Sequence, residues 1–290
     1  VVSHKNLLFN ECNDCHNYHD NSVNYSKHFI EKHLNDELER LTESTLLTRN
    51  FSKFYKKKHK SKKPLAWREQ DAPETIETHL AKNWENSSHA LAGVNCQDCH
   101  KQKNKQWLNK PPPEACKTCH KRELKGFLES KHGMRIKQGL SPLSTGDARL
   151  PMKNEDHELS CTSCHNKHTF KIEVAAVESC LKCHNDEHSQ AFKASKHYQL
   201  WIDKNNIGVS CATCHLPRIK KGKKVFVQHN QNENLRPKQK MVKTVCVNCH
   251  GFSFSIDALQ DEELIDNNFS TKPIKHIPLL DMWKQKLNNN

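Results

Sequence analysis

The sequence has few of the residues that build a hydrophobic core. Leu, Ile, Val and Phe make up only about one residue in five of the 290, close to the level at which highly charged chains stay disordered. Glycine is scarce, at 8 residues, and strand-like alternation is nearly absent, which disfavours sandwiches and barrels. No apolar run approaches the ~20 residues that a membrane-spanning helix needs. A chain of this composition is expected to fold around something other than its own side chains.

The printed sequence also has no initial methionine and no charged-then-apolar leader. It begins with Val1, Val2, Ser3 and His4. Such a beginning is expected of a mature chain whose export signal has been removed. We therefore expect a periplasmic or extracellular protein without a transmembrane segment.

Cysteine, by contrast, is abundant and regularly placed. All 14 cysteines fall into seven Cys-X-X-Cys-His motifs, and none is left over. This is the attachment signature of c-type haem: two thiols bind the porphyrin, and the adjacent histidine becomes the proximal iron ligand. The sequence therefore predicts seven covalently bound haems. The motifs are Cys12–Cys15–His16, Cys96–Cys99–His100, Cys116–Cys119–His120, Cys161–Cys164–His165, Cys180–Cys183–His184, Cys211–Cys214–His215 and Cys246–Cys249–His250.

Zinc knuckles, disulfides and redox dithiols are the alternative uses of paired cysteines. None of them explains a histidine directly after the second cysteine in all seven motifs. Haem also supplies the missing apolar core, because helices can cover its flat macrocycle. Two propionates on each haem would offset the formal charge of +13, so the basic chain is not taken to bind nucleic acid. Redox proteins are the expected partners.

Residues 53–63 form a separate basic run with seven lysines. It is either a solvated loop or helix end, or a docking patch for an acidic redox partner or a membrane surface.

Fourteen histidines remain for the sixth position of the irons. A Ser-Lys-His phrase ends 12, 12 and 13 residues after three of the motifs. On a helix this spacing spans about 18 Å, too far for the same iron, so these histidines should bind neighbouring haems. The predicted sixth ligands are His28, His89, His132, His168, His197 and His229, with His19 in reserve for His28.

The predicted fold is mainly α, with helices and loops packed around a haem array and little β structure. Helical composition marks residues 27–48, 121–131, 188–203 and 255–266. We expect an N-terminal haem segment with a basic insertion over 1–79, a multihaem core over 80–266 and a tail over 267–290. The tail is interpreted as a docking arm or an oligomer contact.

Several phrases resemble the octahaem hydroxylamine oxidoreductase family. They cover about residues 80–255 and include WENSSHALAGVNCQDCH, CKTCHKRELKGFLESKHG, CTSCHNKHTFKIEVAAVESCLKCHNDEHSQAFKASKH, GVSCATCH and VQHNQNENLRPKQKMVKTVCVNCH. The resemblance implies an open, catalytic fourth haem on His165, with protons supplied by Asp186, Glu187 and His188. This chain has seven motifs rather than eight. It also has no tyrosine after Tyr198, which argues against the tyrosine cross-link of the family's oxidative members.

Two main functions follow. The first is electron transfer through mostly bis-histidine haems, with His188 or His157 closing the fourth. The alternative is a redox enzyme that reduces or oxidises nitrite or hydroxylamine at the haem on His165. Haem storage is a third, lesser possibility.

Overall fold

The structure is a computed structural model that describes residues 25–33, 63–101, 104, 106–148, 152–153, 158–203, 208–222, 224–278, 280–282 and 285. Some sequence-based predictions lie outside these residues. They include the first haem motif, Cys12–Cys15–His16, the alternative ligands His19 and His157, residues 34–48 of the first expected helix, and all of the basic run except Lys63.

The described residues divide into two compact units. Unit 1 contains those of residues 1–47 and 185–290, and unit 2 contains those of residues 48–184. The boundary falls directly after His184, inside the segment 80–266 that we expected to be one core. Four described haem motifs belong to unit 2 and two belong to unit 1.

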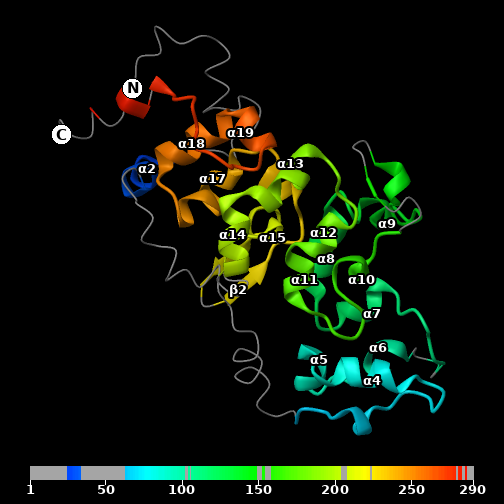
Figure 1. Cartoon of the computed structure of the whole chain (residues 1–290). Coiled ribbons are helices and arrows are strands. Elements are labelled where there is room, and N and C mark those ends of the chain that lie inside the picture. The colour runs from blue at the N-terminus through cyan, green and yellow to red at the C-terminus, as the bar shows by residue number, and fades with distance from the viewer. Residues whose placement is uncertain are drawn as a thin grey trace. The chain divides into compact units, whose positions relative to one another are not determined.

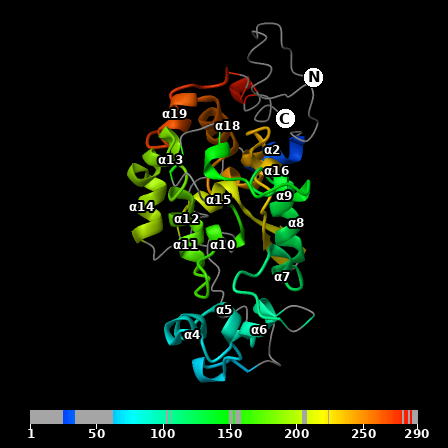
Figure 2. The same ribbon diagram turned by 90° about the vertical axis from the view of Figure 1, so that its right-hand side faces the viewer.

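Unit 2 consists of short helices joined by loops (Figure 1). In Figure 2, α7, α8 and α9 follow one another as a continuous column. The helices are η3 (Trp67–Glu69), α4 (Thr78–Glu85), α5 (Ser88–Leu91), α6 (Cys96–His100), α7 (Pro113–Lys117), α8 (Lys121–Glu129), α9 (Met134–Lys137), η4 (Thr145–Asp147), α10 (Cys161–Cys164), α11 (Ile172–Ala176) and α12 (Glu178–Leu181).

Unit 1 is also mainly helical and adds one antiparallel hairpin. Strand β1 (Arg218–Lys221) pairs with β2 (Lys224–Val227), with Arg218 opposite Val227. Gly222 follows β1 with a φ of 60°, which the tight turn requires and glycine adopts without strain. The helices are α2 (Lys27–His33), α13 (Glu187–Ala191), η5 (Phe192–Ala194), α14 (Lys196–Asp203), α15 (Cys211–His215), α16 (Asn232–Leu235), α17 (Lys240–Thr244), η6 (Cys246–Asn248), α18 (Phe252–Gln260) and α19 (Glu262–Asp266).

Local capping explains why several helices begin at a haem motif. In three motifs the residue before the first cysteine is the N-cap, and the residue before the second cysteine bonds back to its backbone N–H. Such a capping box satisfies N–H groups that would otherwise lack a partner. The N-caps are Asn95, Ser160 and Ser210, and the side chains that bond back are those of Asp98, Ser163 and Thr213, at 2.8, 2.9 and 3.0 Å.

The buried apolar side chains of unit 1 form a cluster around Val242 of α17 and Ile256 of α18, which are 0% and 1% exposed. Tyr25, two residues before α2, and Phe29 of α2 pack edge-on against Phe252 in the same cluster. The prediction of a mainly α fold with little β structure is confirmed. In the described part of the chain, no helix is long and apolar enough to cross a membrane.

Candidate haem sites

The six described haem motifs form two runs in which successive motifs lie close together. In unit 2, the thiol of Cys161 lies close enough to Cys116 to lower the pKa of Cys116. Burial raises the pKa of Cys164 to about 11, with further contributions from Cys180 and Cys183 of the next motif.

Two further pKa shifts indicate that other successive motifs also lie close together. Burial raises the pKa of Cys99 to about 11, and Cys116 of the following motif adds to this shift. In unit 1, burial raises the pKa of Cys214 to about 12, with contributions from Cys246 and Cys249. None of the cysteines in the described part forms a disulfide. The motifs from residue 96 to 184 thus form one run, and those from 211 to 250 form another.

Five of the six described motif histidines lie opposite a histidine from outside the motifs. The two rings of each pair have centroids 5.9 to 6.2 Å apart, and no pair joins two motif histidines. The pairs are His89 with His120 at 5.9 Å, His100 with His168 at 6.0 Å, His132 with His184 at 6.2 Å, His188 with His215 at 6.0 Å, and His197 with His250 at 6.2 Å.

This separation fits one metal ion between two imidazoles. Metal–nitrogen bonds of about 2 Å, with about 1.1 Å from each nitrogen to its ring centroid, place two coordinating rings about 6.2 Å apart. Rings in van der Waals stacking would be closer, as in the 4.7 Å between His100 and Trp107. A haem iron takes two axial ligands from the protein, and each pair supplies two. The paired residues therefore fit a haem.

The protonation states of the paired histidines suit this role. Burial lowers the pKa of His89, His132 and His197 to about 4. These imidazoles are neutral near pH 7, so a nitrogen lone pair is available to a metal. His165 lies close enough to His89 to contribute to its low pKa.

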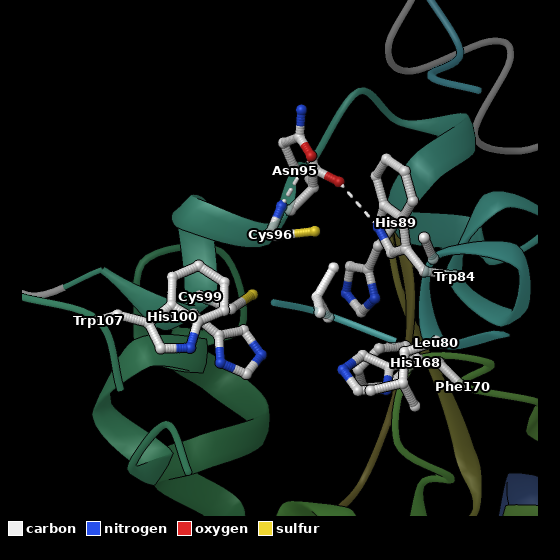
Figure 3. A pocket seen from close by; sticks show the side chains of 13 residues that line it. Leu80, Trp84, His89, Asn95, Cys96, Cys99, His100, Trp107, His168 and Phe170 are labelled. Carbon is white, nitrogen blue, oxygen red and sulfur yellow. Dashed lines mark hydrogen bonds between the residues drawn. The ribbon is translucent and has the colours of Figure 1, made fainter. Parts of the chain in front are cut away.

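A pocket in unit 2 collects a complete set of haem-binding groups (Figure 3). Its cavity volume is about 50 Å³. His100 Nδ1 donates to the carbonyl of Leu108 at 2.6 Å, which leaves Nε2 as the acceptor nitrogen. Both thiols, the histidines His89, His100 and His168, and the apolar walls thus face one space. Its lining includes Cys96, Cys99, His100, His168, Leu80, Trp84, Trp107 and Phe170.

A common turn presents three of the paired histidines. Each follows by two residues a serine that is at most 2% exposed. The backbone N–H of that serine donates to the carbonyl of an aromatic residue three positions earlier, at 2.8 to 3.0 Å. The three turns are Trp84–Ser87–His89, Phe127–Ser130–His132 and Phe192–Ser195–His197.

The structure gives the expected catalytic groups other contacts. His188 faces His215, and its Nδ1 donates to the carbonyl of Ile265 at 2.5 Å. Asp186 caps α13 and accepts from Ser189 N and Oγ at 3.1 and 2.9 Å, whereas Glu187 is exposed. These three residues belong to unit 1, and His165, at the C-cap of α10, belongs to unit 2.

Two of the expected sixth ligands are not among the five ring pairs. His28 lies exposed on α2. His229 is half-buried after β2, and its Nδ1 donates to the carbonyl of Val227 at 3.1 Å.

Sequence reasoning missed several residues that surround these histidines. It did not pair His188 with His215, and it gave no role to Phe170, Asn268 or Phe269. The Nδ2 of Asn268 donates to the carbonyl of His188 at 2.9 Å. The sequence marks these residues only by their position. Phe170 follows His168 by two residues, and Asn268 and Phe269 follow shortly after the end of α19.

Comparison with known proteins agrees with this geometry. Residues 88–185, which hold four of the motifs, match the family model of cytochrome c3. No curated protein matches the chain, and neither does any solved structure. The match supports a multihaem c-type cytochrome without singling out the octahaem hydroxylamine oxidoreductase family. The chain is thus a multihaem cytochrome with covalently bound haem iron and a role in electron transfer.

Proposed function

We propose that this chain binds seven haems and conducts electrons through them, with histidine on both faces of most or all irons. The observation that carries this function is the set of five ring pairs, each joining a motif histidine to another histidine at 5.9 to 6.2 Å. A haem iron with two histidine ligands has no vacant position for a substrate. Such a haem, when bound, would supply reversible one-electron transfer.

The proposed ligands are sufficient for every iron. His89, His132, His168, His188 and His197 serve the motif histidines that they face. His28 and His229 remain proposed axial ligands without an assigned iron. His188 thereby becomes an axial ligand rather than a proton donor, which favours the conduit.

The two runs of neighbouring motifs support conduction within each unit. Close attachment cysteines, such as Cys116 and Cys161, require the edges of successive haems to be close as well. We propose redox proteins as partners, with the segment 267–290 as a docking arm or oligomer contact. The proposed location is the periplasm or the cell exterior, typical of the cytochrome c3 family.

The second candidate is a redox enzyme acting on nitrite or hydroxylamine at an open haem on His165, as the resemblance to hydroxylamine oxidoreductases implies. It needs a proton donor beside that iron. The contacts of Asp186 with Ser189 and of His188 with Ile265 engage two of the three groups that the resemblance offers.

Ligand binding separates the two functions. The reduced holoprotein is mixed with carbon monoxide, nitrite or hydroxylamine and followed by absorbance. A closed conduit shows no change with any of the three. An enzyme shows a shift in about one haem of seven, because five-coordinate iron has a free position. That shift would overturn the closed array.

A further inference from the structure

Four non-glycine residues in the described part of the chain have positive φ, and all four belong to or touch the paired histidines. Left-handed backbone costs a non-glycine residue about 1–2 kcal/mol, and such strain concentrates at functional sites. The residues are His168 (φ 66°), Phe170 (φ 47°), Asn268 (φ 55°) and Phe269 (φ 56°).

The first two belong to a turn directly after the motif histidine His165. The N–H of Phe170 donates to the carbonyl of Asn166 at 2.9 Å, which closes the turn. His168 points toward His100, while the ring of Phe170 meets the ring of His89 edge to face, with centroids 4.4 Å apart. One strained turn therefore supplies the partner of His100 and the neighbour of His89.

His89 differs from His100 and His188 in its second nitrogen. Its Nδ1 is buried and has no hydrogen-bond partner. His100 Nδ1 donates to the carbonyl of Leu108 at 2.6 Å, and His188 Nδ1 to that of Ile265 at 2.5 Å. The Phe170 ring occupies space beside His89 and offers no oxygen acceptor.

The hydrogen bond on the outer nitrogen tunes an axial histidine. An imidazole that donates to a carbonyl becomes a stronger base, which stabilises ferric iron and lowers the reduction potential. An imidazole without an acceptor favours ferrous iron by comparison. The apolar walls around His89, including Trp84 and Phe170, act in the same direction, because low polarity disfavours the more highly charged ferric state.

We propose that Phe170 is a positioning residue that keeps His89 without a hydrogen-bond acceptor, and that it thereby raises the reduction potential of the haem on His120 above those on His100 and His215. The inference rests on the proposed ligation of that haem by His89.

The test is a spectroelectrochemical titration of the holoprotein with two kinds of substitution at Phe170. Phe170→Gln introduces an amide oxygen beside His89, and Phe170→Asn does so with a residue that tolerates left-handed backbone. Either variant should move one haem's share of the absorbance change to a lower potential. Phe170→Leu, the matched apolar control, should leave that wave in place or move it less.

Replacing His89 separates the proposed ligation of the haem by His89 from the proposed effect of Phe170. His89→Met should convert one bis-histidine haem to histidine–methionine ligation, visible in the near-infrared magnetic circular dichroism. Adding Phe170→Gln to His89→Met should then produce no further lowering, since methionine has no N–H to donate.

Each outcome decides a different claim. Unchanged ligation in His89→Met would overturn the proposed ligand and the inference with it. Changed ligation, together with an unmoved wave in both Phe170→Gln and Phe170→Asn, would overturn the inference alone. An equal lowering in the presence and absence of His89 would also overturn it, because the effect would then act on the haem edge and not through the imidazole.

Discussion

Replacing His188 by alanine tests the haem array at the point where structure and family resemblance differ most. The substitution removes the ring that lies 6.0 Å from His215. Asn268 directs its amide Nδ2 at His188 Nε2, 3.3 Å away, and an amide NH₂ is a hydrogen-bond donor rather than a metal ligand. We expect the iron on His215 to become five-coordinate.

The size of the effect follows from the number of motifs. One haem in seven should change from low to high spin, so about one seventh of the haem absorbance should respond and about one equivalent of carbon monoxide should bind. Imidazole added to the solution should restore the low-spin spectrum by filling the vacated position. Both readouts are spectroscopic and need no assumption about a substrate.

Two histidines outside the pairs provide matched controls. His79, whose side chain is 62% exposed beside Glu77, and His276, on the C-terminal segment, can each be replaced by alanine. Neither change should alter the spin state. If His188→Ala leaves all haems low-spin and silent to carbon monoxide, His188 is not an axial ligand. A fall in nitrite or hydroxylamine turnover with no change in spin state would restore its role as a proton donor.

Three further predictions concern composition and stability. The holoprotein should exceed its 33.7 kDa polypeptide by seven haem masses in intact mass spectrometry, with no thiol titratable after unfolding; four or fewer haems would contradict the motif assignment. Hydrogen bonds from His276 to Asp257 and Asp281 raise the pKa of His276, so the stability that they add is complete below the unfolded pKa near 6.5 and is lost as pH rises through the higher folded pKa. In denaturant titrations, His276→Gln should lower the free energy of unfolding by less than about 1 kcal/mol at pH 5.5 and leave it unchanged at pH 9. An equal decrease at both pH values would refute this linkage. Gly208→Ala should lower the free energy of unfolding by about 3 kcal/mol, because a Cβ there would lie 2.3 Å from the main chain of α14. Gly139, with a φ of 73°, has open space around it, so Gly139→Ala should lower that free energy by only about 1 kcal/mol. Equal urea midpoints for the two variants would contradict this contrast.

The sequence was sufficient for features that depend on neighbouring residues. The attachment motifs and the mainly helical fold were predicted, and the capping pair Asn95 and Asp98, which was not predicted, likewise involves residues only three positions apart. Capping chemistry acts over three residues, so it can be read directly from the chain. The short hairpin of β1 and β2 was less visible, because lysine-rich strands of four residues carry little alternation.

Histidine pairing could not be deduced in the same way. The spacing of 12 or 13 residues excluded a bond to the preceding iron, but it could not say which later motif each histidine faces. His132 meets His184 and His197 meets His250, each about 50 residues further along. Such distances are set by how the intervening helices fold back, a property of tertiary packing rather than of local sequence. The division of the chain after His184 was hidden for the same reason.

The repeated turn before the paired histidines shows how local sequence and long-range pairing are joined. Ser130 and Ser195 are both 0% exposed, and the hydroxyl of each donates to an aromatic carbonyl three residues earlier, at 2.7 and 2.6 Å. A buried serine with both its N–H and its hydroxyl bonded locally fixes the backbone, so the histidine two residues later leaves the turn in a defined direction. The turn is encoded by a six-residue phrase, while its target is supplied by another motif. A chain with few apolar residues can thereby assemble a many-haem core from short local turns, because each turn needs only to orient one histidine side chain.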